Sequence, residues 1–112
     1  MSGFDGFIAG GGGGGGTAPI VTITVLDSPF TPTNANFTVL CDASGGPISV
    51  TLPAGATMVG QGFNFKKIDA SANIITITPN GAELIDGAAN KKLIMQYTTI
   101  SIQTDGSNWY IL

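Results

Sequence analysis

Carboxylates are the side chains of this sequence that could do acid–base chemistry. Glu83 and Asp86 lie close together in the chain, and a glycosidase needs two carboxyl groups about 5–10 Å apart. Both also flank the turn residues Gly81 and Gly87, where acidic side chains commonly accept backbone hydrogen bonds. We therefore expect these two acids to hold turns, and the sequence does not predict an enzyme.

The remaining acids and the missing histidine exclude most other site chemistry. Asp42, Asp69 and Asp105 are interpreted as turn residues, because no Asp-x-Asp-x-Asp-Gly calcium loop occurs. Zinc normally needs several Cys or His ligands, whereas this chain has 1 Cys and no His. Without His there is also no Ser-His-Asp or Cys-His nucleophile pair. We expect no catalytic residues, no bound metal and no cofactor.

Net charge and hydropathy limit the classes of partner that the protein can bind. The net charge is −3 and the basic residues are 4 lysines, which argues against nucleic acid, because cationic groups must neutralise its phosphates. No apolar run approaches the roughly 20 residues that span a bilayer, so membrane insertion is not expected. The N-terminus lacks the features of a signal peptide, and a lone cysteine forms no internal disulfide. We expect a protein made in the cytoplasm.

The low proportion of charged residues is informative about the surface. Only 10% of residues are charged, against about 25% in an ordinary soluble domain. Thr, Ser, Asn and Gly must therefore cover most of the exterior. Such a surface favours burial in an assembly or contact with neutral polar ligands such as sugars; the alternative is an unremarkable uncharged β-domain.

Aromatic residues near the C-terminus offer a candidate sugar site. Tyr97, Trp109 and Tyr110 could stack on pyranose rings, with hydrogen bonds from Asn108 and Gln96. The interpretation that we favour is that Trp109 fills the core or a subunit interface, because a Trp in an alternating strand is a large apolar side chain.

Cysteine and lysine have simpler expected roles. Cys41 alternates with apolar neighbours and is expected to be a small buried hydrophobe. The pairs Lys66-Lys67 and Lys91-Lys92 are expected to be solvated. In a chain without Arg they are also the only candidates for salt bridges across an interface.

The elements that must position these residues are strands. Apolar and β-branched residues alternate with polar ones, and no window forms a convincing amphipathic helix. The expected strands span residues 20–26, 37–41, 48–52, 63–66, 74–78, 93–97, 100–103 and 109–112. Many short strands joined by turns predict an all-β domain, a small β-sandwich or barrel of short antiparallel strands.

Two turn signals give more detail. Asp105-Gly106 predicts a hairpin with a type I′ turn, which needs positive φ at both central positions. Residues 42–53 resemble residues 69–79, and the copies begin 27 residues apart. Each copy has Asp-Ala-Ser at a turn, an alternating strand and a proline. We interpret them as two similar stacked hairpins, because a solenoid needs at least three copies.

The N-terminal section, residues 1–18, is predicted to lie outside the β-domain of residues 19–112. It contains an unbroken glycine run that includes Gly10, Gly13 and Gly16. Such a run predicts a flexible tether with a reach of about 15 Å. The apolar residues ahead of it are Phe4, Phe7 and Ile8. They are interpreted as a docking peptide for a partner; the alternative is a frayed tail with incidental aromatics.

From Val39 onward the chain resembles a domain common in bacteriophage virion proteins. The ordered segments that carry the resemblance are Val39-Leu-Cys-Asp-Ala-Ser44, Val50-Thr-Leu-Pro53, Phe65-Lys-Lys-Ile-Asp-Ala-Ser-Ala-Asn73, Ile75-Thr-Ile-Thr-Pro-Asn-Gly81, Ile85-Asp-Gly87, Gln96-Tyr97 and Asp105-Gly-Ser-Asn-Trp-Tyr110. Similar segments end phage tail fibres, head fibres and other appendages, which are often homotrimers with β-rich heads.

The resemblance implies a structural protein of the virion. In long fibres the domain follows a stalk, whereas here it follows only a tether and one strand. This placement favours a capsid-decorating head fibre or cement protein, with Phe4, Phe7 and Ile8 as its anchor in a capsid or tail protein. The alternative is a short tail appendage that recognises host cell-surface glycan.

Overall fold

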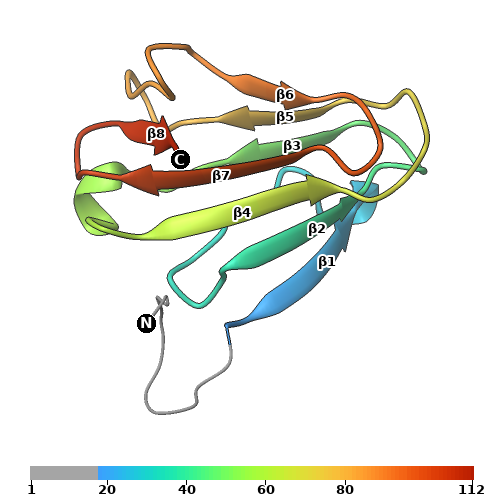
Figure 1. Cartoon of the computed structure of the whole chain (residues 1–112), viewed down its shortest axis with the longest axis horizontal. Helices are drawn as coiled ribbons and strands as arrows, with labels where there is room; N and C mark the ends of the chain where they lie inside the picture. Colours follow the sequence, from blue (N-terminus) through green and yellow to red (C-terminus); the bar gives the residue numbers. More distant parts are fainter. Residues whose placement is uncertain (1–17) are drawn as a thin grey trace.

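The computed structural model describes residues 18–112, which form two β-sheets (Figure 1). The first sheet has five strands in the order β1-β2-β4-β7-β8, and the second has three in the order β3-β5-β6. The bounds are β1 Ile20–Thr24, β2 Thr38–Asp42, β3 Ile48–Thr51, β4 Gly62–Lys67, β5 Ile75–Thr78, β6 Lys91–Leu93, β7 Thr99–Thr104 and β8 Trp109–Ile111. Two short 3-10 helices, η1 (Val25–Asp27) and η2 (Gly55–Thr57), are the only helices in the described part of the chain. The prediction of an all-β fold is confirmed.

Both sheets contain parallel and antiparallel pairs. Strands β1, β2 and β4 run parallel, as do β3 and β5. The pairs β4–β7, β5–β6 and β7–β8 are antiparallel. The prediction of only antiparallel strands is therefore wrong. The cause is that the chain crosses to the other sheet after β1, β2 and β4, so strands of one sheet recur in the same direction.

The internal repeat forms corners between the sheets. Residues 43–47 connect β2 of the first sheet to β3 of the second, and residues 68–74 connect β4 to β5 in the same way. Val39 lies beside Phe65 in one sheet while Ile48 lies beside Ile75 in the other. Each repeat copy is thus one coil stacked on the next. The interpretation of the copies as hairpins is wrong, because their two strands do not pair with each other.

A third coil completes the stack. Strand β1 pairs with β2, and Phe30 forms a parallel bridge with Val50 of β3. Residues 20–30 therefore follow the same path through both sheets as the two later coils. This coil turns through η1 and lacks the Asp-Ala-Ser signal, which is why the sequence repeat shows two copies only.

One hydrophobic cluster lies between the sheets. Alternation points every second residue of β2, β3, β4, β5 and β7 inward, and these residues are almost completely buried. Trp109 is fully buried, and its ring stacks on Phe63 at a centroid distance of 5.7 Å. The interpretation of Trp109 as a core residue is confirmed. The cluster consists of Ile23, Val39, Cys41, Ala43, Ile48, Val50, Leu52, Phe63, Phe65, Ile75, Ile77, Ile85, Leu93, Ile100, Ile102 and Trp109.

The two Asp-Gly pairs form different turns. Asp86 and Gly87 both have positive φ, 47° and 77°, and Ile85 and Ala88 exchange two backbone hydrogen bonds. This is the two-residue type I′ geometry. Between β7 and β8 the predicted hairpin is present, but only Gly106 has positive φ (99°) and four residues separate the paired Thr104 and Trp109. The type I′ prediction at Asp105-Gly106 is therefore wrong.

The loops gather at two ends of the molecule. Figure 1 shows the corners after β1, β2 and β4 at one end, together with the loop between β6 and β7. The turn before β8, the loop between β5 and β6, and η2 lie at the other end. We call these the corner end and the hairpin end.

Replacing Trp109 tests how far the core depends on one ring. We expect Trp109→Ala to lower the free energy of unfolding by about 3–5 kcal/mol, because a large buried side chain leaves a cavity. Trp109→Phe keeps a ring against Phe63, and the indole Nε1 has no hydrogen-bond partner to lose. We expect it to cost markedly less. Urea unfolding followed by circular dichroism measures both, and a loss below about 1 kcal/mol for the alanine variant would contradict the packing.

Candidate functional site

A lysine and an aspartate are buried together at the corner that follows β4. The side chain of Lys67 is 0% exposed and that of Asp69 is 7% exposed, and their Nζ and Oδ2 atoms lie 2.9 Å apart. A buried charge without a partner would be costly, so each group requires the other. The prediction of a solvated Lys66-Lys67 pair is therefore wrong for Lys67, whereas Lys66 remains half-buried on the outer face of β4.

The ion pair is the centre of a larger polar network. Lys67 Nζ also donates to the carbonyl oxygen of Asn73 at 2.9 Å and contacts Ser71 Oγ at 3.4 Å. The Ser71 hydroxyl and its backbone N–H both donate to Asp69 Oδ2. Lys67 is the last residue of β4, and the bent corner that follows brings Asp69, Ser71 and Asn73 back around its ammonium group.

The network ties one coil to the next. The backbone N–H of Ala43 donates to Asp69 Oδ1 at 2.7 Å, and Asn73 Nδ2 donates to the Ala43 carbonyl oxygen at 2.7 Å. Side chains of the corner 68–74 therefore satisfy the backbone of the corner 43–47. These residues belong to the segments that carry the resemblance to virion proteins, and their contacts assign them a structural role.

The environment of Asp69 keeps its carboxylate ionised. Burial by itself raises the pKa of Asp69, but hydrogen bonds from the side chains of Ser71 and Lys67 and from the backbone of Ala43 and Ser71 outweigh it. They hold the pKa of Asp69 well below its ordinary value. The Asp69 carboxylate is therefore negatively charged at neutral pH and neutralises the positive charge of Lys67 beside it.

The acids considered for catalysis hold backbone groups instead. Both carboxylate oxygens of Glu83 accept the N–H of Gly55 at 3.1 Å, and Asp86 Oδ1 accepts the N–H of Ile111 at 3.1 Å. The two acids therefore bind backbone groups, as expected, but those of distant segments, η2 and β8, and the prediction that they hold their own turns is wrong. In residues 18–112, no three His, Cys, Asp or Glu side chains gather in a way that could hold a metal ion.

Asp42 and Asp105 are turn residues, as predicted. Asp42 Oδ1 accepts the N–H of Ser44 at 3.0 Å, and hydrogen bonds from the Ser44 side chain and backbone lower the pKa of Asp42. Asp105 Oδ1 accepts the N–H groups of Ser107 and Asn108, both at 2.9 Å. The bonds from Asn108 and Ser107 lower the pKa of Asp105.

Cys41 is an unreactive core residue. Its side chain is fully buried between the sheets, and burial raises the pKa of the thiol to about 12. The nucleophilic thiolate therefore does not form at neutral pH. The prediction of a small buried hydrophobe is confirmed.

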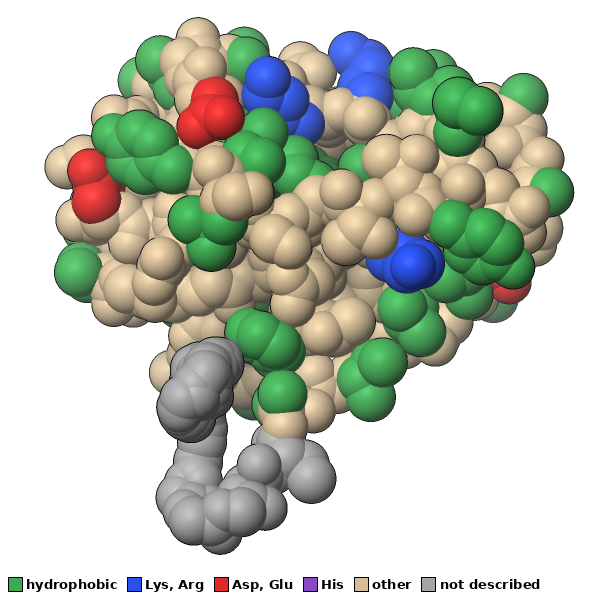
Figure 2. Space-filling model, viewed as in Figure 1, with side chains coloured by type: hydrophobic (Ala, Val, Ile, Leu, Met, Phe, Trp, Pro, Cys, Tyr) green, Lys and Arg blue, Asp and Glu red, His purple; other side chains and the backbone are tan. Residues whose placement is uncertain are grey.

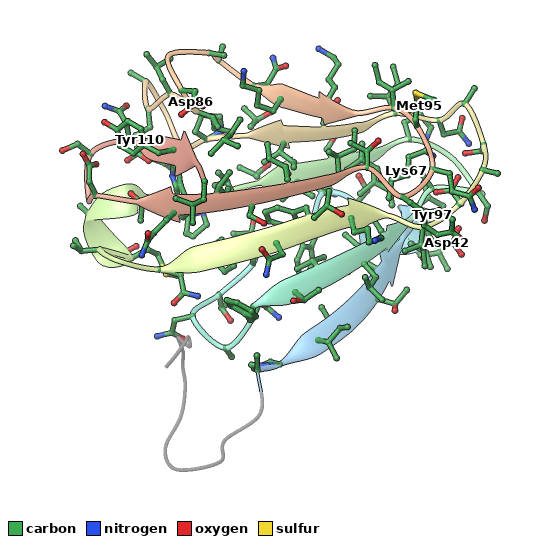
Figure 3. All side chains as sticks on the ribbon, viewed as in Figure 1. Asp42, Lys67, Asp86, Met95, Tyr97 and Tyr110 are labelled. Carbon is green, nitrogen blue, oxygen red and sulfur yellow. The ribbon has the colours of Figure 1, made fainter. Side chains whose placement is uncertain are left out.

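The residues considered for sugar contact do not form one site. Trp109 is fully buried, so it presents no face to a ligand. Asn108 uses its Oδ1 to accept the N–H of Leu84 at 3.0 Å. Tyr97 and Tyr110 are exposed, but Figure 3 shows Tyr97 at the corner end and Tyr110 at the hairpin end. The sugar-contact alternative is therefore wrong for Trp109, and the two tyrosines cannot bind one ring.

The loop between β6 and β7 holds its apolar side chains outward. Ile94, Met95 and Tyr97 are 53%, 73% and 62% exposed. Tyr97 has a φ of 67°, which is strained for a bulky residue, and its N–H donates to the Lys67 carbonyl oxygen at 2.6 Å. Lys66 Nζ lies 5.6 Å from the centre of the Tyr97 ring. The sequence contains no signal for this conformation, because a tyrosine does not favour positive φ.

The surface carries few charges, as the composition predicts. Figure 2 shows few charged side chains on the face seen in that view. Across the outer side of the first sheet, Ser101 Oγ donates to Asn64 Oδ1 at 2.6 Å and Asn64 Nδ2 donates to Thr38 Oγ1 at 3.4 Å. On this face, uncharged polar side chains thus form hydrogen bonds with one another.

The N-terminal residues of interest lie outside the described part of the chain. These are the predicted anchor and tether residues Phe4, Phe7, Ile8, Gly10, Gly13 and Gly16. Their predicted roles stay predictions.

No protein-family model matches this chain, and the search of curated proteins finds no match. Over residues 18–112, no helix has the length and apolar character needed to cross a bilayer.

Removing one member of the buried ion pair should destabilise the fold. We expect Asp69→Asn to lower the free energy of unfolding by about 3–5 kcal/mol, because it leaves the Lys67 charge buried without its partner. The double variant Lys67→Met, Asp69→Asn should recover part of this loss. Asp42→Asn is the matched control from the other repeat copy and should cost much less, since Asp42 holds only a surface turn. Equal losses for Asp42→Asn and Asp69→Asn in urea unfolding would contradict the assignment.

The ion pair also predicts how stability depends on pH. Because the pKa of Asp69 is lowered in the folded state, its stabilisation is complete above the unfolded-state value of about 3.9 and is lost as the pH falls below it. Asp42 and Asp105 act in the same direction. We expect the midpoint of urea unfolding to decrease between about pH 4 and pH 2. The decrease should be smaller in Asp69→Asn, and an identical decrease would show that Asp69 is not the main group.

Proposed function

We propose that this protein is a structural protein of a bacteriophage virion, a head fibre or cement protein that decorates the capsid. The observation that carries the proposal is the polar corner network. Lys67, Asp69, Ser71 and Asn73 belong to the segment through which the chain resembles virion appendage domains, and they build the contact that stacks its coils. The resembling residues thus specify a rigid head.

The surface of the head suits a structural role. The acids that could have served catalysis, Glu83 and Asp86, are engaged with backbone N–H groups. The thiol of Cys41 is buried and protonated. What the described residues present to the outside is a largely uncharged surface, which is compatible with close packing against other protein subunits.

Attachment to the particle is assigned to the N-terminal section. In this proposal Phe4, Phe7 and Ile8 insert between capsid or tail subunits, and the glycine run from Gly10 to Gly16 links them to the head. The copies associate through their heads, as a homotrimer by the resemblance. Several tethers on one assembly raise the effective concentration of each anchor, so that weak single contacts suffice.

Recognition of host glycan by a short tail appendage is the alternative function. With Trp109 in the core, the exposed aromatic residues are Tyr97, beside Gln96 and Lys66, and Tyr110, beside Asp105, at opposite ends of the molecule. A single ring held in this way is a small platform for a sugar. Capsid decoration therefore remains the proposal that we favour.

Deleting the N-terminal section tests the attachment. We expect a variant that lacks residues 1–16 to keep the far-ultraviolet circular dichroism and thermal stability of the head and to lose binding to particles of the phage that encodes it. Co-sedimentation with purified particles measures the binding. The variant Phe4→Ser, Phe7→Ser, Ile8→Ser, which retains the glycine run, should lose binding as well.

The two variants separate the anchor from the tether. Binding retained by the deletion variant would overturn the anchor assignment. Binding retained only by the serine variant would move the contact from the three apolar residues to the glycine run.

A further inference from the structure

The exposed edges of the two sheets are protected to different degrees. Strand β6 has three residues and carries Lys91 and Lys92, and β8 has three residues with one N–H, that of Ile111, bound to Asp86. Short length and charge are the usual means of preventing edge-to-edge pairing. Strand β1 has five residues, Ile20–Thr24, with no charge and no proline among them. The fourth edge strand, β3, is covered by Phe30, which exchanges backbone hydrogen bonds with Ser49 and Thr51. In the described part of the chain, β1 is therefore the edge strand without such protection.

The backbone of β1 has hydrogen-bonding groups directed away from the sheet. Thr38 donates to the carbonyl oxygen of Pro19, so the odd-numbered residues of this segment face β2. Consistent with this, the N–H of Thr24 faces outward and donates to Asp27 Oδ2 at 2.8 Å. The N–H and C=O groups of Ile20 and Thr22 share that outward direction. Within residues 18–112 they have no partner.

The hydrophobic core is also incomplete on this side. Within residues 18–112, three apolar residues pack against the core while remaining partly exposed, and two of them, Val21 and Phe30, belong to the first coil. Ile20 is 65% exposed and Leu26 is 91% exposed. Figure 2 shows hydrophobic side chains along the margin of the molecule that β1 occupies in Figure 1. We call β1 together with Leu26 and Phe30 the open side.

We propose that the open side is the surface through which copies of this chain associate. The inference rests on the self-association in the proposed function and names where it occurs. A second copy is the occupant that fits, because the open side itself has no charged residue and Asp27 is the one charge beside it within residues 20–30, so identical surfaces meet with little repulsion between like charges. An unprotected sheet edge can pair with another uncharged strand rich in β-branched residues, and β1 of a second copy is such a strand.

The position of β1 in the chain connects this contact with attachment. Strand β1 begins at Ile20, directly after the N-terminal section. Association at the open side therefore brings together the points from which the N-terminal sections of neighbouring copies start. Anchors that start close together can engage neighbouring sites on one particle, which is the condition for avidity.

A lysine on the exposed edge tests the contact. Thr22 is exposed, so Thr22→Lys places a charge on the edge of β1 without entering the core. The matched control is Thr78→Lys, which places the same charge at an exposed position of β5, inside the second sheet. Light scattering after size exclusion gives the mass of each full-length protein at micromolar concentration.

We expect the wild type and Thr78→Lys to have the same mass, a multiple of the 11.3 kDa chain. We expect Thr22→Lys to have the mass of one chain, with an unchanged circular dichroism spectrum. Leu26→Ser should shift the mass in the same direction without adding charge. An unchanged mass for Thr22→Lys, or its loss in Thr78→Lys as well, would overturn the proposal.

A monomeric wild type would overturn it too. That result leaves capsid attachment to the separate co-sedimentation experiment, so the two proposals fail independently.

Discussion

The ion pair between Lys67 and Asp69 is the constraint on which the rest of the fold depends. A lysine that points into the core requires a carboxylate within hydrogen-bond distance, and this requirement fixes the path of the chain immediately after β4. With Asp69 placed, its second oxygen reaches Ala43 of the neighbouring corner, so two coils must stack in one register. The main effect of the pair is therefore on which structure forms, because the attraction between buried charges is largely offset by their desolvation.

The strands could be predicted from the sequence, because alternation translates directly into the two faces of a strand. Whether neighbouring strands are parallel or antiparallel could not be predicted. The Asp-Ala-Ser turn sequence is the same whether the chain turns back within its own sheet or crosses to the other sheet. Lys67 was predictable: alternation from Phe63 and Phe65 places it on the buried face, and Asp69 is the next acid along the chain. The general preference of lysine for water hid this signal.

Turns and surface sites depend on tertiary context that the sequence does not contain. The same Asp-Gly dipeptide forms a type I′ turn at Asp86 and a wider loop at Asp105, where the Asp105 side chain caps two later N–H groups. Alternation places Trp109 in the core. It gives no indication that Tyr97 and Tyr110 are far apart, which follows from the position of β7, whose ends reach the two opposite ends of the molecule.

The positions of the few lysines determine which surfaces remain for assembly. Lys67 neutralises an internal carboxylate, Lys66 lies over the Tyr97 ring, and Lys91 and Lys92 protect the edge at β6. With all four committed in this way, no positive charge remains to protect β1. An ordinary domain with more charged residues would place some of them at this edge. The scarcity of charge in the composition and the unprotected edge in the fold are thus one property of the chain, and it favours contact with an equally uncharged neighbour.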